Sequence, residues 1–173
     1  MKFDIQQTTQ TDHEAILEIH RQAFGREAEA QLVDLLVKAN KGVISLVAVT
    51  AEQLVGHILF SPVTLENEIE IVDIRLLGLG PIAVFPQFQG LGAGSQLIQA
   101  GIQKCRELAF AGMVVLGSPT YYGRFGFVTA SQFGFGNEYG VDAAFMAQPL
   151  FADAFLHKSG LIKYAPEFAQ TGS

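Results

Sequence analysis

The sequence feature that most constrains this chain is a glycine-rich segment, QGLGAG at residues 89–94. It separates an apolar, strand-like run at residues 76–85 from a helix-patterned run at residues 95–109. Glycines in such a connection let the backbone approach a ligand closely, and the amides of a first helical turn carry a partial positive charge. The segment therefore indicates a site for a phosphate-bearing ligand. The alternative is that the glycines serve only the packing of a tight turn.

Two common phosphate motifs do not fit this segment. No Gly-Lys-Ser/Thr ending follows, as a P-loop for nucleoside triphosphates requires. The glycines at 90, 92 and 94 also miss the dinucleotide spacing, and no parallel repeat of strand and helix follows. The sequence predicts a ligand that carries a diphosphate but is neither ATP nor NAD.

A second motif, YYGRFGF at residues 121–127, follows an apolar strand-like run at residues 113–116. Together the two motifs resemble those of the GCN5-related N-acetyltransferases. That family has a Gln/Arg-x-x-Gly-x-Gly/Ala loop, which holds the pyrophosphate of acetyl-CoA, and a later Tyr-x-x-x-Gly-Phe element. The matching residues are Gln89, Gly92 and Gly94 for the loop, and Tyr122, Gly126 and Phe127 for the later element.

Further segments resemble the YhbS-type subgroup of bacterial predicted acetyltransferases. These are GHILFSP at 56–62, LGLGP at 77–81, AFM at 144–146 and GLIKY at 160–164. The resemblance covers nearly the whole chain. It implies an α/β fold with a mixed, mostly antiparallel central sheet that is splayed at the cofactor site and flanked by helices. It also implies acetyl transfer from acetyl-CoA to a primary amine by direct attack in a ternary complex.

The resemblance also implies which residues bind coenzyme A. Loop amides would hold the pyrophosphate, and the main chain of the preceding strand would pair with the pantetheine arm as an added strand does. Gly78, Gly80 and Pro81 favour a bulge in that strand, where a freed amide could polarise the thioester carbonyl. The expected cofactor-binding residues are Ile82, Ala83, Val84, Gln89, Gly90, Leu91, Gly92, Ala93, Gly94, Ser95 and Ser118.

Tyr122 is the predicted catalytic residue. A phenol with a pKa of about 10 is matched to protonate a leaving thiolate, whose thiol has a pKa of about 8.5. Tyr121 lacks the family spacing to Gly126, and the alternative is that both tyrosines are packing aromatics. The general base stays open: His57, Asp73 and Glu70 are candidates, and so are ordered waters.

The composition limits other functions. The 173 residues predict a single domain spanning 1–173, which the resemblance implies is an N-acetyltransferase domain. A net charge of −6 argues against a nucleic-acid partner. The single cysteine, Cys105, excludes an internal disulfide, and the four histidines lack metal-ligand spacing, so no metal is expected. The sequence shows no membrane or signal segment, which predicts a cytoplasmic protein. The expected partner is a small-molecule or peptide amine, and a homodimer stays open.

Hydrophobic periodicity places the elements. Strands are expected at 3–7, at 113–116, near 144–150 and near 160–164. An antiparallel hairpin is expected at 43–49 and 54–63, and residues 65–76 are expected to continue the meander. A capping box at Thr11 and Glu14 predicts a helix to about Ala23. The expected buried helical positions are Ala15, Ile16, Ile19, Ala23, Phe24, Leu32, Val33, Leu36, Val37, Leu97, Ile98, Gly101, Ile102, Cys105, Leu108 and Ala109. Residues 125–139 are expected near the acceptor, and Arg124 on the surface.

Three functions stay open on these grounds. The leading one is the acetyltransferase. The second is a CoA-binding sensor or regulatory module that has lost turnover, against which the retention of Tyr122 argues. The third is a transferase for a longer acyl group, since no sequence pattern measures the width of the pocket around the thioester.

Overall fold

The computed structural model describes residues 1–171, which form two compact units. Unit 1 comprises residues 1–61, 80–104 and the C-terminal segment from Pro166. Unit 2 comprises residues 62–79 and 105–165. Strands β3 (Gln53–Glu66) and β4 (Leu76–Val84) and helix α3 (Ala93–Glu107) each begin in one unit and end in the other.

The strands of unit 1 form an antiparallel meander. β1 (Asp4–Gln7) pairs with β2 (Ile44–Thr50), which pairs with β3. Thr50 lies opposite Gln53, so Ala51 and Glu52 alone make the turn, and both have positive φ, 48° and 63°. Two positive φ angles are typical of the type I′ turns that match the twist of paired strands. The predicted hairpin is confirmed.

The two faces of β3 contact different helices, because neighbouring side chains of a strand point to opposite faces. A Cβ on Gly56 would lie 3.1 Å from Leu97 of α3, and a Cβ on Gly101 of α3 would overlap the ring of Phe60. On the other face, His57 contacts His20 of α1 (His13–Phe24). Helices therefore cover β3 on both sides, which is why its residues 55–61 are buried without alternation.

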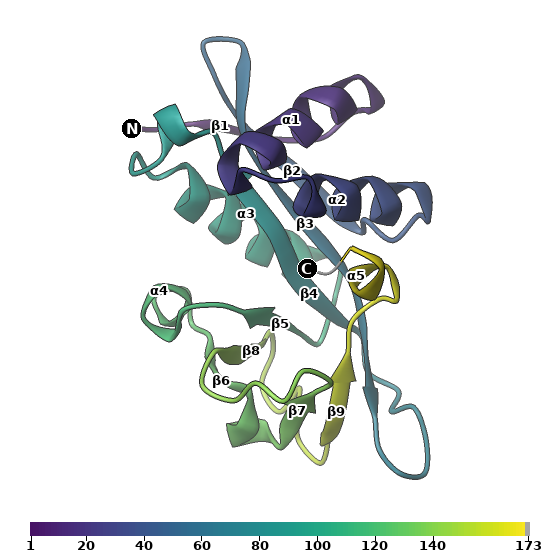
Figure 1. Cartoon of the computed structure of the whole chain (residues 1–173). Helices are drawn as coiled ribbons and strands as arrows, with labels where there is room; N and C mark the ends of the chain where they lie inside the picture. The colour runs from purple at the N-terminus through teal and green to yellow at the C-terminus, as the bar shows by residue number, and fades with distance from the viewer. Residues whose placement is uncertain (172–173) are drawn as a thin grey trace. The chain divides into compact units, whose positions relative to one another are not determined.

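Helix α1 is followed by α2 (Ala28–Lys38), and the two lie side by side in Figure 1. The capping box expected at Thr11 and Glu14 is wrong. A 3₁₀ turn, η1 (Gln10–Asp12), precedes α1, and the carboxylate of Asp12 accepts the N–H of Thr9 at 2.9 Å. Because of this extra turn, the helical segment starts after Thr9 and not after Thr11, so the N–H groups without a helical partner lie two residues earlier than expected. The short C-terminal helix α5 (Glu167–Gln170) also belongs to unit 1. Its Glu167 forms an ion pair of 2.6 Å with Lys41.

Most of the predicted helical core is buried, including Ile16 and Ile19 of α1 and Leu32, Val33 and Leu36 of α2. The prediction was wrong for residues at the ends of helical stripes. The exceptions are Ala15, which is exposed, Ala23, which is half-buried, and Phe24, Val37, Leu108 and Ala109, which are exposed. Phe24 is the last residue of α1, and Leu108 and Ala109 lie beyond the last residue of α3. A side chain at or beyond the end of a helix can therefore be exposed even where its spacing matches that of the buried face.

Unit 2 contains mixed pairing. The first three residues of β4 pair in parallel with β5 (Gly112–Leu116), and β5 pairs antiparallel with β8 (Phe145–Pro149). β8 also pairs with β6 (Val128–Thr129). β9 (Gly160–Lys163) runs antiparallel to the end of β3 and parallel to β7 (Phe135–Asn137). Shorter elements are η2 (Pro86–Phe88) in unit 1, and α4 (Pro119–Gly123) and η3 (Ala130–Phe133) in unit 2.

Residues 67–75 do not continue the meander as expected. They form a loop in which the side chain of Asn67 accepts the N–H groups of Ile69 and Glu70, at 2.8 and 2.9 Å. An asparagine bonded to the backbone two residues on closes a turn instead of a ladder. Ile69 is 92% exposed, so its apolar side chain gave a misleading strand signal.

Across residues 1–171, no helix is long and apolar enough to cross a membrane.

Candidate active site

The glycine loop of unit 1 lies between η2 and the start of α3 and is exposed to solvent. Gly90 and Gly92 have φ of 77° and 94°, a region that residues with side chains rarely adopt. A Cβ on Gly90 would meet nothing within 4 Å. The glycine at 90 is therefore required by backbone conformation and not by close packing, and the space beside it is open.

Side chains on both sides of the loop fix its shape. The amide of Gln89 donates to the carbonyl of Val84 at 3.0 Å, which ties the loop to the end of β4. Gln96, in the first turn of α3, accepts the N–H of Phe3 and donates to the carbonyl of Met1, both at 2.8 Å. Gln89 was expected as part of the cofactor-binding loop, and its hydrogen bond shows how it holds the loop in place. The contribution of Gln96 was not foreseen.

The first turn of α3 presents its amides to this loop. The N–H of Gln96 bonds to the carbonyl of Gly92 at 3.1 Å, so the amides of Ala93 and Gly94 precede this helical bond. Amides at the start of a helix have no carbonyl partner within the helix and add to its partial positive charge. Ser95 lies in the same turn, and Leu91 is 42% exposed at the tip of the loop.

The end of β4 supplies main-chain groups next to the loop. Ala83 is buried, whereas Ile82 and Val84 are half-buried. Gly80 has φ of 132°, again a conformation that favours glycine, and the parallel register with β5 covers β4 only as far as Gly78. The irregular backbone predicted around Gly78 and Gly80 is present at Gly80.

Tyr122 lies in unit 2, on the short helix α4, and only 8% of it is exposed. Its ring packs edge-on against Tyr121 and Phe127, with centroids 5.1 and 5.9 Å away. Burial, with a smaller contribution from Tyr121, raises the pKa of Tyr122 to about 12. The phenol is therefore a packed ring that is protonated at neutral pH, and it is a weaker acid than the ordinary phenol assumed in the sequence prediction.

Ser118 begins helix α4. It is the N-cap residue, and its Oγ accepts the N–H of Tyr121 at 3.3 Å. Pro119 follows at the first helical position, where its missing N–H costs nothing. The Ser-Pro pair was the sequence signal for this cap, and it was not recognised as one. Ser118 thus orients the helix that carries Tyr122.

Gly126, the glycine of the second motif, is required by close approach. Its φ is 97°, and a Cβ there would lie 2.5 Å from Nε2 of Gln148. That nitrogen donates to the carbonyl of Phe125 at 3.1 Å. The family spacing between Tyr122 and Gly126 therefore corresponds to a turn that is held against β8.

The candidate bases occupy different environments. His57 is fully buried, and both its ring nitrogens are hydrogen-bonded, to His20 and to Ser45. Burial foremost, and then the charges of His20 and His13, lower its pKa well below the usual value, so it is a neutral structural histidine. Glu70 and Asp73 are exposed in the 67–75 loop. Arg124 is exposed, as expected, and lies over the ring of Tyr121 at 5.2 Å.

Cys105 is fully buried near the end of α3. Burial raises the pKa of its thiol to about 12, against a small opposing effect of Arg106. A thiol in this state is not a nucleophile, and the expectation that it fills the core is confirmed.

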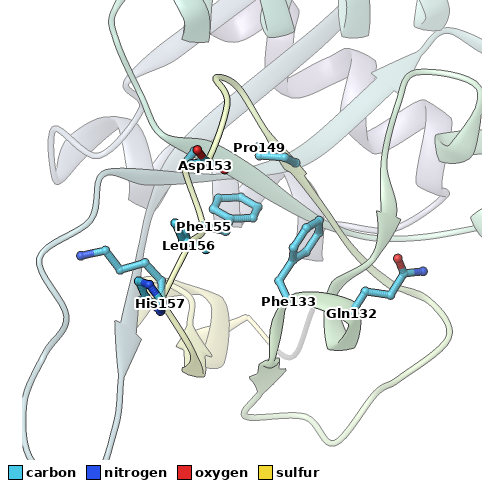
Figure 2. Close-up of a pocket in the computed structure, with 9 residues that line it drawn as sticks. Gln132, Phe133, Pro149, Asp153, Phe155, Leu156 and His157 are labelled. Atoms are coloured by element: carbon cyan, nitrogen blue, oxygen red, sulfur yellow. The ribbon is translucent and has the colours of Figure 1, made fainter.

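Each unit also contains a cavity. The cavity of unit 2 has a volume of about 400 Å³ and includes Gln132 and Phe133 from the segment expected near the acceptor. Figure 2 shows the rings of Phe133 and Phe155 turned toward one another in this cavity, and their centroids are 4.9 Å apart. The cavity of unit 1, of about 370 Å³, reaches His57. Within residues 1–171, no group of three or more His, Cys, Asp or Glu side chains could hold a metal.

Comparisons with known proteins agree with these features. An acetyltransferase (GNAT) domain model matches residues 4–130. The N-acetyltransferase YhbS of Escherichia coli K12 is 34% identical over 150 residues, which are 86% of this chain and 87% of that protein. The N-acetyltransferase YjhQ of the same strain is 37% identical over 127 residues, 72% of this chain and 69% of that protein.

Solved structures give the same result. The crystal structure of Escherichia coli YhbS in complex with CoA matches with a TM-score of 0.90 and 31% identity, over 98% of this chain and 93% of that one. A GNAT family acetyltransferase from Brucella melitensis, in complex with acetyl-CoA, matches with a TM-score of 0.78 and 30% identity, over 96% and 98%. The predicted fold is thereby confirmed. The chain belongs to the GCN5-related N-acetyltransferase (GNAT) family and is an acyltransferase.

Proposed function

We propose that this enzyme transfers the acetyl group of acetyl-CoA to a primary amine, with both substrates bound at once. The observation that carries the proposal is the exposed glycine loop at the start of α3, with Gly90 and Gly92 in conformations that favour glycine. The complexes of Escherichia coli YhbS with CoA and of the Brucella relative with acetyl-CoA support the same donor.

The residues of unit 1 fit a pyrophosphate and a pantetheine arm. The loop is open where a Cβ on Gly90 would point, and the amides of Ala93 and Gly94 stand at the positive end of α3. We assign the pyrophosphate to the amides of residues 90–95, and the pantetheine amides to the main chain of residues 82–84. The carbonyl of Val84 already accepts from Gln89, so the groups of Ile82 and Ala83 are assigned the larger part.

The chemical step needs one proton on sulfur. The amine nitrogen attacks the thioester carbonyl carbon, the C–S bond breaks, and its electron pair remains on sulfur. We assign to Tyr122 the donation of its phenolic proton to that thiolate. Tyr122 is protonated at neutral pH, but its raised pKa makes it a weaker acid than the thiol, so proton transfer to the thiolate depends on the rapid return of a proton to the phenol. The surplus proton of the amine leaves to water or to a base and finally restores the phenol.

The acceptor is assigned only as a class, a small-molecule or peptide amine. Residues 125–139 combine glycine with aromatic side chains, which suits an amine with some apolar surface. The same fold could bind CoA without turnover or take a longer acyl group, and the experiment separates these functions.

The test has two stages. Thermal unfolding is followed with acetyl-CoA, CoA, ATP or NAD, and binding at one hundred times the dissociation constant adds about 2.7 kcal/mol to stability. We expect stabilisation by acetyl-CoA and CoA only. Amines are then screened by release of free thiol, with acetyl-CoA and a longer acyl-CoA compared as donors. Stabilisation without thiol release from any amine would indicate a binding module, and no stabilisation by millimolar CoA would contradict the donor assignment.

A further inference from the structure

A second cavity, distinct from the glycine loop, lies within unit 1. It has a volume of about 370 Å³, which falls within the range of small-molecule sites. Ile16 of α1 and Val33 and Val37 of α2 supply the apolar side chains of its lining. The polar lining comes from Ser45 of β2 and His57 of β3, and also from Thr8, Thr9, Gln10 and His13. Val37 is 39% exposed, so solvent reaches this side of the cavity lining. An apolar wall facing a few polar groups is typical of a ligand site.

The polar lining includes the end of a hydrogen-bonded chain that runs into the protein. Oγ of Ser45 lies 2.8 Å from Nε2 of His57, and Nδ1 of His57 lies 2.8 Å from Nε2 of His20. Both histidines are fully buried, whereas Ser45 is half-buried and lines the cavity. Nδ1 of His20 is buried without a hydrogen-bond partner. Ser45 is therefore the member of this chain that a ligand can reach.

The surroundings of His20 decide whether the hydroxyl of Ser45 donates or accepts in its hydrogen bond with His57. Burial lowers the pKa of His20 to about 4 and that of His57 well below its usual value, so each ring carries a single N–H at neutral pH. If His57 accepted the proton of Ser45, His20 would have to keep its N–H on the unpartnered Nδ1. Buried N–H groups without a partner are rarer than acceptors with an unused lone pair. The favoured arrangement has His20 donating to His57 and His57 donating to Ser45, which leaves the serine proton for the cavity.

The charges around the cavity restrict the ligand further. Among the described residues that line it, none is Asp, Glu, Lys or Arg. His13, which lines the cavity, already contacts the carboxylate of Asp34 at 2.8 Å, and Asp34 is also engaged by Lys38 at 2.6 Å. A charged ligand would lose its water without gaining an opposite charge, which is costly.

We propose that this cavity binds a small uncharged molecule whose carbonyl oxygen accepts the hydroxyl proton of Ser45 and whose short apolar chain packs on Ile16, Val33 and Val37. The site is separate from acetyl transfer, and its test needs no acetyl-CoA. The ligand class is a ketone, ester or amide of a few carbons. Binding would fix the direction of the hydrogen bonds that link Ser45 to the buried histidines.

The test compares three probes with the same apolar chain: 2-pentanone, butyrate and pentan-2-ammonium. They differ in carrying an uncharged acceptor, an anionic acceptor and a cationic donor. Binding is followed by saturable shifts of the backbone amide signals of Thr8, Gln10 and Ser45, and the nitrogen signals of the histidine rings report where each proton lies. We expect 2-pentanone to bind at least about fivefold more tightly than either charged probe, with protons on Nε2 of His57 and Nε2 of His20.

Two variants and one control make the test specific. Ser45→Ala should weaken the binding of 2-pentanone about fivefold, the loss of one neutral hydrogen bond. Val37→Phe should block the cavity without touching the histidine chain. The control is Ser61→Ala, since Ser61 is a buried serine of β3 that does not line the cavity. The proposal is overturned if 2-pentanone gives no saturable shifts, if Ser45→Ala and Val37→Phe both bind it like the parent, or if a charged probe binds as well.

Discussion

The ring of Tyr122 lies directly on the backbone of Gly117, so closely that a Cβ at position 117 would overlap Cε2 of the phenol. Gly117 follows the last residue of β5 and precedes Ser118, the cap of α4. The tyrosine ring is thus held by the backbone that leads into its own helix. This packing is compatible with the acid role proposed for Tyr122, because it holds the phenol in one place.

Replacing Tyr122 by Phe should keep this packing and remove only the proton. We expect turnover to fall roughly 10²- to 10⁴-fold, with little change in CoA affinity, as for the loss of a general acid. Tyr121→Phe is the matched control, because Tyr121 precedes Tyr122 in α4 and its ring contacts that of Tyr122. Steady-state rates and the dissociation constant of CoA check both variants. Equal losses of turnover in Tyr122→Phe and Tyr121→Phe would contradict the assignment of Tyr122 as the general acid.

Ser118 offers a second test, because it can act as a helix cap or as a neighbour of the cofactor thiol. If the cap dominates, Ser118→Ala should destabilise the protein by about 1 kcal/mol, and Ser118→Asn should restore the stability, since asparagine caps helices equally well. Urea unfolding measures both, and turnover should follow the same order. A loss of turnover in Ser118→Asn at full stability would instead indicate direct contact with the substrate.

Gly92 tests the phosphate site. Gly92→Val should abolish the stabilisation by CoA, because a Cβ there would lie 3.4 Å from Nε2 of Gln96 and the valine methyl groups would crowd the loop to which the phosphate is assigned. The variant also strains the backbone, since φ at Gly92 is 94°. Gly140→Val is the control for strain alone: φ there is 69°, and a Cβ would meet nothing within 4 Å. Melting curves with and without CoA compare the two variants. If CoA still stabilises Gly92→Val, the phosphate site is not in this loop.

Most of the fold could be predicted from sequence patterns within short segments. The hairpin turn, the strand before the glycine loop and α3 each depend on residues close together in sequence, and each formed as expected. The errors lie where tertiary packing decides: Phe24 and Leu108 have the right spacing but stand at helix ends, and Ile69 lies in a loop closed by Asn67.

The chain of Ser45, His57 and His20 could not be predicted. Its members come from β2, β3 and α1, and no spacing rule links them. His57 was expected only as one of the candidate general bases. His20 falls on the buried stripe of α1 beside Ile16 and Ile19, and that position was the one available signal for its burial.

The buried histidines predict a loss of stability in mild acid. The folded-state pKa of His20 is about 4, lowered by burial against an opposing effect of Glu29, whereas the unfolded value is about 6.5. Below pH 6.5 the unfolded chain binds a proton that the folded one does not, so stability falls as the pH drops from about 6.5 toward 4.

The slope should reach about 1.4 kcal/mol per pH unit for His20 alone, and His57 should add to it. Paired carboxylates such as Glu29 lose their contribution only below about pH 4.3, outside the range of pH 7 to 5 that is measured. Urea unfolding at pH 7, 6 and 5 measures the slope, and the ring nitrogen signals should show both histidines neutral in the folded protein at pH 5. Constant stability over this range would contradict the burial of neutral rings.

The order of chemical events can be tested at Cys105. A covalent acetyl-enzyme needs an accessible thiolate, but this thiol is fully buried and its pKa is raised to about 12. We therefore expect intersecting double-reciprocal lines when acetyl-CoA and amine are both varied, as a ternary complex gives. Cys105→Ala should keep turnover within a few-fold of the parent, and the native thiol should resist a disulfide reagent until the protein unfolds. Parallel lines together with an acetyl group trapped on Cys105 would overturn both the direct transfer and the buried, unreactive state of that thiol.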